Sequence, residues 1–129
     1  MIEAGAALQQ AIFTRFDAHS DIISQFRTHI NAHENWPQFS FDGIESRALP
    51  NDMDIVLHNI DFAIWADVNA VADASDLAAR LVAIIDDTLI IDGYSLIRLH
   101  AQRAEGGVQS AEKLWRVNLR FEAITRKKT

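Results

Sequence analysis

The chain has no cysteine, only two prolines and five glycines, and no apolar run of membrane-spanning length. Without cysteine, a disulfide scaffold, a thiolate zinc site and thiol catalysis are excluded, and the absence fits a reducing compartment. A transmembrane helix needs about 20 consecutive apolar residues, which no stretch approaches. Residues 1–5 lack the basic and apolar regions of a secretory signal, so we expect none.

Acidic residues outnumber basic ones, 18 against 12, which gives a formal net charge of −6. This balance disfavours binding to nucleic-acid phosphates over most of the surface. The basic cluster at residues 126–128 is better interpreted as a solvated tail than as a binding patch. If this acidic protein lies beside DNA, we expect it to form a surface along which DNA moves without being bound.

Length and composition are those of one globular domain. The chain has 129 residues, 49% hydrophobic and 23% charged, and no repeat, linker or low-complexity segment divides it. We therefore expect residues 1–129 to form a single domain.

Apolar residues recur at three- and four-residue spacing in two segments, which predicts two amphipathic helices. One covers residues 4–16, with a short further turn over residues 20–26, and the other opens at the cap-forming residues 73–76. The expected buried residues are Leu8, Ile12 and Phe16 in the first helix and Leu77, Leu81 and Ile85 in the second.

Alternation of apolar and polar residues predicts strands, most clearly over residues 114–123. The predicted strands are residues 38–44, 54–67, 94–103 and 114–123, with shorter ones at 28–32 and 89–91. We expect Ile97, Leu99 and Ala101 to share one side of their strand. Residues 46–52 and 105–110 are predicted loops, and Asp92-Gly93 is a predicted tight turn. Helix, strands, helix and strands in this order predict an α+β fold: a largely antiparallel sheet of about four to five strands with two helices packed on one face.

Candidate metal ligands are few. His29 and His33 are four residues apart with Glu34 adjacent, a spacing that on a helix places two imidazoles on one metal. Nearby asparagines and Pro37 disfavour a helix there, so a loop-anchoring role is the simpler interpretation. His58 interrupts an apolar strand face, where a buried, hydrogen-bonded histidine is the usual finding.

Signs of catalysis are absent from the sequence. No serine lies in a nucleophile-elbow setting, and no carboxylate pair is marked as acid and base. Gly106-Gly107 lacks the lysine and helix of a phosphate-binding loop. Asp86 and Asp87 oppose the dipole of the second helix, which indicates either a solvated turn or a partner's cation. We predict no enzymatic activity, no cofactor and no metal.

Exposed aromatic and arginine side chains are the better candidates for function. Trp36 lies in a predicted loop, and Trp65 points away from the apolar face of its strand, where its own chain or another subunit must cover it. Arg116 and Arg120 face outward, either in cross-strand ion pairs or towards carboxylates such as Asp61 of an adjoining copy.

Three passages carry a resemblance to a known family. They are AALQQAIF at residues 6–13, WPQFSFDG at residues 36–43, and the pairing of IDFAIWA at residues 60–66 with WRVNLRF at residues 115–121. The chain resembles the tail-completion, or tail-terminator, proteins of long-tailed bacteriophages and of bacterial gene transfer agents. The similarity covers nearly the whole chain and the order of its elements. One departure is Phe26-Arg27-Thr28-His29, where the family often has a glycine-containing turn.

The resemblance implies a structural virion protein that forms a ring, usually six-fold, at the head-proximal end of the tail tube. Such a ring stops tube polymerisation, joins the tail to the head and leaves a lumen for DNA. It implies assembly in the bacterial cytoplasm and three kinds of partner: further copies of the chain, the tail tube protein and a head-tail connector or stopper, with no membrane. The alternatives are another connector layer, such as a stopper, or a small metal- or ligand-binding domain using His29, His33 and Glu34.

On this interpretation, the contacts with tube or head fall in loops at residues 35–37, 47–53 and 105–110. The subunit interface is expected at Trp65 and two outward arginines. The full set of expected interface residues is Trp36, Pro37, Trp65, Glu105, Gly106, Gly107, Val108, Arg116 and Arg120.

Overall fold

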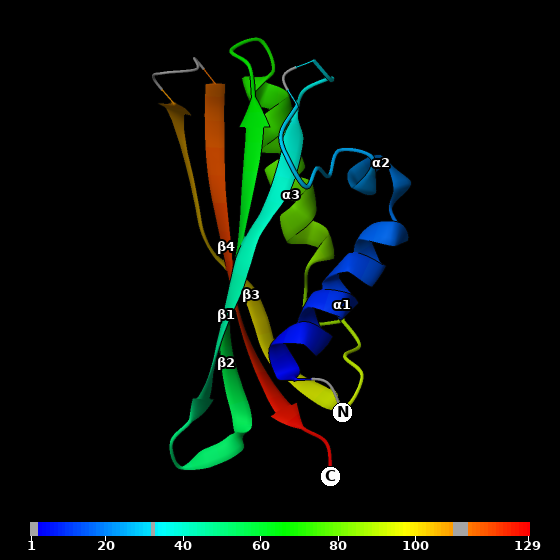
Figure 1. The fold of residues 1–129 in the computed structure, drawn as a ribbon, viewed down its shortest axis with the longest axis vertical. Coiled ribbons are helices and arrows are strands. Elements are labelled where there is room, and N and C mark those ends of the chain that lie inside the picture. Colours follow the sequence, from blue (N-terminus) through cyan, green and yellow to red (C-terminus); the bar gives the residue numbers. More distant parts are fainter. Residues whose placement is uncertain (1–2, 32, 110–113) are drawn as a thin grey trace.

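A computed structural model describes residues 3–31, 33–109 and 114–129. Its helices cover one face of a long, twisted four-stranded sheet (Figure 1). The elements are α1 (Ala4–Asp17), α2 (Ser20–Ile23), β1 (Gln38–Leu49), β2 (Asp52–Ala66), α3 (Val71–Ile84), β3 (Tyr94–Gln109) and β4 (Leu114–Lys127). Within these described residues, every helix is too short or too polar to span a bilayer. The α+β class predicted from the sequence is confirmed.

All strand neighbours are antiparallel, in the order β1-β2-β4-β3. β1 pairs with β2 and β3 pairs with β4, each with the next strand along the chain. The connection through α3 carries the chain from β2 across to the far edge, and β4 then returns between them. β1 and β3 are therefore the two edge strands.

The core lies between the sheet and the two long helices. The alternation predicted for β4 is confirmed, because Val117, Leu119, Phe121 and Ala123 are buried on one side of the strand. Four phenylalanines extend from α1 across the sheet with ring centroids 5.5 to 6.2 Å apart, mostly edge to face. These rings are Phe16, Phe39, Phe62 and Phe121.

Two short predicted strands are wrong. In the segment 28–32, of which Ala32 lies outside the described residues, the chain is irregular, and only Phe26 just before it forms a parallel bridge to Phe39. In the segment 89–91, Ile91 alone forms a bridge, to Tyr94. In the segment 89–91, Leu89 and Ile91 are buried without regular strand pairing, so their burial resembles that of a strand in sequence.

Two predicted loops are largely strand. β1 continues to Leu49, so only Pro50 and Asn51 form the turn, and β3 continues to Gln109. Ser110, at the end of the second predicted loop, lies outside the described residues. Long partner strands extend the pairing across both polar stretches. A register shift between Leu96 and Arg98 also leaves Ile97 54% exposed, so the expectation that it shares a side with Leu99 is wrong.

Gly106 makes room for an indole ring. A Cβ at this position would lie 2.7 Å from Cζ2 of Trp115, whereas a Cβ at Gly107 would meet nothing within 4 Å. We predict that Gly106→Ala lowers the free energy of unfolding by about 1–3 kcal/mol through overpacking, and that Gly107→Ala is close to neutral. Urea unfolding followed by tryptophan fluorescence measures both. Equal effects of the two substitutions would contradict this packing argument.

Candidate interaction surface

Cross-strand ion pairs organise the outer face of the sheet. The register sets Asp61 of β2 opposite Arg120 of β4, and Nε and Nη2 of the arginine donate to the two carboxylate oxygens at 2.7 and 2.9 Å. This pairing raises the pKa of Arg120 above its ordinary value. Arg116 donates to Asp42 of β1 at 2.8 Å and to Asn118 at 2.6 Å. Both arginines therefore have partners within their own chain.

Trp65 is covered by the same network. The guanidinium carbon of Arg116 lies 4.8 Å from the centroid of its ring, a cation–π contact. Trp65 remains only half-buried, so part of the ring is accessible. The covering group within the chain is thus a neighbouring strand's arginine rather than a loop.

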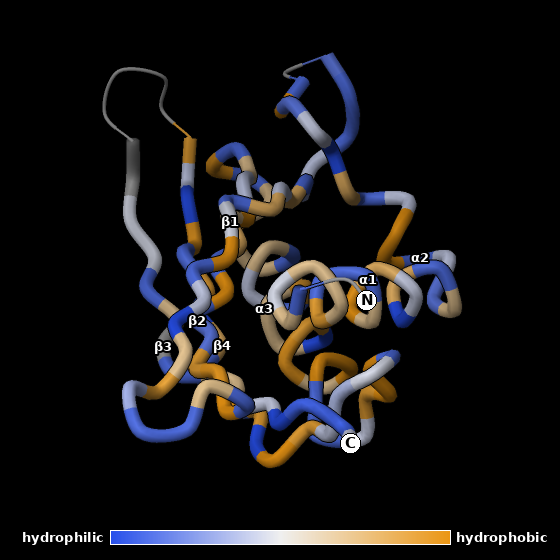
Figure 2. The backbone as a smooth tube through the Cα atoms, turned by 60° about the horizontal axis from the view of Figure 1, so that its bottom comes forward, coloured by the Kyte–Doolittle hydropathy of each residue, from blue (hydrophilic) through white to orange (hydrophobic). Residues whose placement is uncertain are grey.

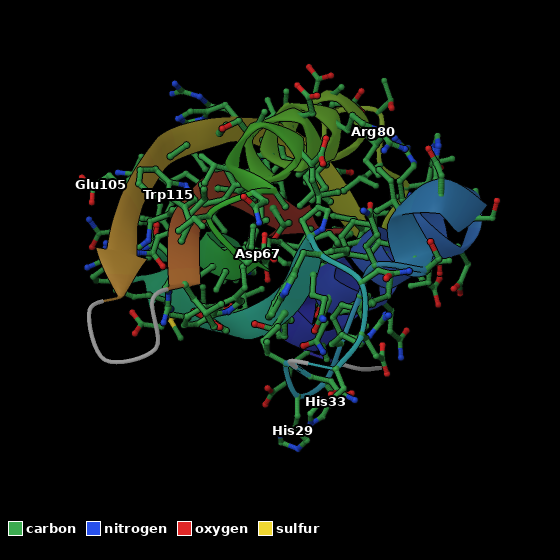
Figure 3. The ribbon with its side chains drawn as sticks, turned by 90° about the horizontal axis from the view of Figure 1, so that it is seen from above. His29, His33, Asp67, Arg80, Glu105 and Trp115 are labelled. Carbon is green, nitrogen blue, oxygen red and sulfur yellow. The ribbon has the colours of Figure 1, made fainter. Side chains whose placement is uncertain are left out.

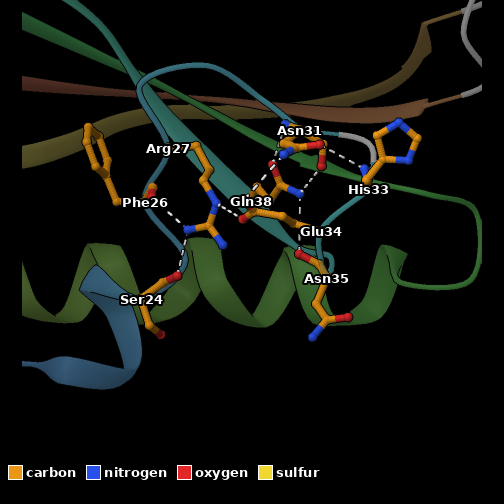
Figure 4. Close-up of polar contacts among 8 residues, drawn as sticks. All are labelled: Ser24, Phe26, Arg27, Asn31, His33, Glu34, Asn35 and Gln38. Carbon is orange, nitrogen blue, oxygen red and sulfur yellow. Dashed lines mark hydrogen bonds and ion pairs between the residues drawn. The ribbon is translucent and has the colours of Figure 1, made fainter.

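Trp36 and Pro37 are less exposed than their loop position predicted. Trp36 packs against the core and Pro37 is buried. The buried side chain of Gln38 holds the preceding loop, because it accepts a hydrogen bond from the backbone N–H of Asn31 at 2.9 Å and donates to its carbonyl at 2.6 Å (Figure 4). Of the three loop residues, Asn35 is the exposed one.

The histidine loop does not assemble a metal site. His29 and His33 are exposed and project outward at one end of the molecule (Figure 3). Glu34 is already engaged by the guanidinium of Arg27 and by the side-chain amide of Asn31. Among the residues that the structure describes, no three His, Asp or Glu side chains come together as metal ligands.

The predicted contact loop at residues 105–110 is, as far as it is described, the end of an edge strand. Glu105, Gly106, Gly107 and Val108 pair with residues 115–118 of β4, and no strand pairs with their other edge within the described residues. The expectation of a flexible connection is wrong there. Adjacent glycines suggested flexibility, but Gly106 is part of the strand and leaves room on one face for the ring of Trp115.

A groove of about 360 Å³ lies between α3 and this part of β3 and β4. Its walls carry no titratable side chain, since they are formed by Ser75, Ala78, Ala79, Val82, Ala104, Gly106, Trp115 and Val117. A groove of this kind accommodates apolar groups and supplies no acid, base or nucleophilic pair.

The cation that pairs with Asp86 is an arginine of the same chain. Arg15 of α1 donates to the carbonyl of Ile84 at 2.8 Å, to Asp86 at 3.4 Å and to the hydroxyl of Thr88 at 3.2 Å. Hydrogen bonds from Thr88, with a smaller contribution from Arg15, lower the pKa of Asp86. This clamp at the end of α3 was missed because Arg15 and Asp86 are far apart in the sequence.

His58 is the buried polar centre of the sheet. Its Nδ1 lies 2.7 Å from the hydroxyl of Ser46 on β1, and its Nε2 lies 2.9 Å from the hydroxyl of Thr125 on β4. Burial lowers the pKa of His58 from 6.5 to about 4. The expected hydrogen-bonded structural histidine is therefore found, and it is neutral at physiological pH.

We predict an acid-sensitive stability from this group. Between pH 6.5 and 4 the unfolded chain binds a proton at His58 that the folded chain does not, so stability falls as pH falls through this window. The loss reaches about 3 kcal/mol, at about 1.4 kcal/mol per pKa unit. Urea unfolding at pH 7 and pH 4 measures it, with His58→Gln as the control that cannot titrate. An identical pH dependence in both proteins would rule out this assignment.

Comparisons with known proteins support the fold. No family model matches the chain, and no curated protein is significantly similar in sequence. Among solved structures, a chain from the virion of a native gene transfer agent particle matches with a TM-score of 0.78 and 17% sequence identity. The match covers 97% of this chain and 99% of that chain. The chain therefore shares, over nearly its whole length, the fold of a protein from a gene transfer agent virion.

Proposed function

We propose that the chain is a structural protein of a phage-like or gene transfer agent particle, with a role in assembly and no catalysis or cofactor. The observation that carries this proposal is the fold shared with a gene transfer agent virion chain from end to end. The described surface fits it, because Arg116 and Arg120 are held in strand-to-strand ion pairs and the groove beside α3 has no titratable side chain in its walls.

More specifically, we propose a ring at the head-proximal end of the tail tube that ends tube polymerisation and joins the tail to the head. A closed ring needs two different, complementary patches on each subunit. β1 and β3 are edge strands on opposite sides of the sheet, and they run in opposite directions because the sheet has four alternating strands. The β1 edge of one copy can therefore meet the β3 edge of the next as an antiparallel pair, in the six-fold arrangement that the resemblance implies.

The proposed subunit contact includes Glu105, Gly106, Gly107 and Val108 on β3, with Trp65, Arg116 and Arg120 on the adjoining outer face. The proposed partners at the two ends of the ring are the tail tube protein and a head-tail connector or stopper. DNA passes through the lumen without being held, since the net charge of −6 disfavours a lasting grip on phosphates. We infer assembly in the bacterial cytoplasm and a final position in the virion, away from membranes.

The experiment is electron microscopy of particles from a strain that lacks this protein. If the chain terminates the tube, its loss leaves tails of uncontrolled length that are not attached to heads. Complementation with the wild-type chain is the control, and it should restore attached tails of uniform length.

Three other outcomes would contradict the proposal. Finished tails of normal length beside leaking heads would assign the chain to a stopper layer instead. Normal particles in the strain without this protein would show that it has no structural role in the virion. Stoichiometric metal in the purified protein, lost on His29→Ala or His33→Ala, would favour the metal-binding alternative.

A further inference from the structure

Large apolar side chains are exposed at a few points of the described surface. They are Met53 (70% exposed), Val68 (65%), Val82 (39%), Ile90 (87%) and Ile97 (54%). The two most exposed are Ile90, in the connection between α3 and β3, and Met53, next to the β1–β2 turn. Both segments lie in the half of the molecule that holds the two chain ends (Figure 1), and Figure 2 shows hydrophobic and hydrophilic stretches side by side near the C-terminus. Val68 follows β2 at the opposite end.

Ile90 is held outward by a rigid connection. Its neighbours Leu89 and Ile91 are only 6% and 2% exposed, so they anchor the backbone on both sides. The clamp of Arg15 on Asp86 and Thr88 fixes the preceding turn. A side chain presented in this way loses little conformational freedom when a partner covers it, which favours binding.

A groove of about 280 Å³ adjoins Ile90. One wall is formed by α1, where the buried Ala7 and Ala11 and the exposed Thr14 offer small side chains. This end of the molecule thus combines projecting apolar groups with a shallow socket, the usual features of a protein contact.

Carboxylates border both projecting side chains. Asp87 and Asp92 flank Ile90, and Asp54 follows Met53; all three are exposed, and none forms an ion pair within the described residues. Lysine or arginine on a partner would complement them. The basic residues 127 and 128 lie at the same end, so self-association is the competing possibility that an experiment must separate.

We propose that the end carrying Met53, Ile90 and the groove on α1 is a docking face for a different protein, one with an apolar socket bordered by lysine or arginine. This inference rests on the proposed function. If copies of the chain form a ring through their sheet edges, the two ends of each copy remain available to the proteins above and below the ring. End-to-end contact between identical rings would continue a tube rather than finish it, so the expected partner is a different protein.

Site-specific photocrosslinking in assembled particles tests the partner. A benzophenone amino acid replaces Ile90, Met53 or, as the matched control at the opposite end, Val68. The expected result is one adduct with the same different protein from positions 90 and 53, and no such adduct from position 68. Adducts between two copies of this chain at position 90, or the same partner from all three positions, would overturn the proposal.

Substitutions then test the chemistry. Ile90→Asp and the charge reversal Asp92→Lys should each lower incorporation into particles at least about tenfold, the effect of losing a contact hot spot. Val68→Asp and Asp76→Lys, at positions that are also exposed but lie elsewhere, should leave it unchanged, and circular dichroism checks that all four proteins fold. Normal incorporation of the first pair would refute the docking face alone, whereas absence of the wild-type chain from purified particles would refute the proposed function as well.

Discussion

The register between β2 and β4 is the constraint on which the rest of the structure depends. Twelve successive residue pairs fix it, from Ile55 with Arg126 to Ala66 with Trp115. On one side this register aligns Phe62 with Leu119 under the helices, and on the other it aligns Asp61 with Arg120 in solvent. A slip of one residue would move every apolar side chain to the wet face and every ion pair into the core. The buried face and the charged face therefore enforce the same alignment, and the buried contacts of His58 extend it to β1.

The central strands are where sequence and structure agree best. In β4 the alternation of Val117, Leu119 and Phe121 reports burial directly, because one face of an antiparallel strand is wet and the other dry. His58 was also interpretable, since a histidine within an apolar strand face needs hydrogen-bond partners wherever they come from. These predictions depend on local periodicity, and local periodicity is what a single sequence records.

The edges and connections could not be predicted in the same way. β3 runs through Gly106 and Gly107 because β4 is long enough to pair with them, and the length of a partner is not a local property. The bulge at Ile97 reverses the side it faces, and the exposure of Ile90 depends on anchors at Leu89 and Ile91. Among the candidate interface residues, the arginines and Trp65 were identified as outward-facing, but their partners within the chain come from register and distant contacts. The ends of the molecule, which carry the exposed apolar side chains, gave the weakest signals in sequence.

Irregularities on the two edge strands have a consequence for the solubility of the chain. β1 breaks register between Phe41 and Gly43, where the glycine has a φ of 141°, and β3 breaks it again between Ala101 and Arg103. An uninterrupted edge of 12 or 16 residues would be a template for indiscriminate stacking into aggregates. Each break shortens the regular stretch of edge with which a strand of another molecule can pair, and it twists the stretch that follows. Both edge strands therefore offer shorter regular stretches to an incoming strand than their lengths suggest, which lowers the tendency of the chain to aggregate through its sheet edges.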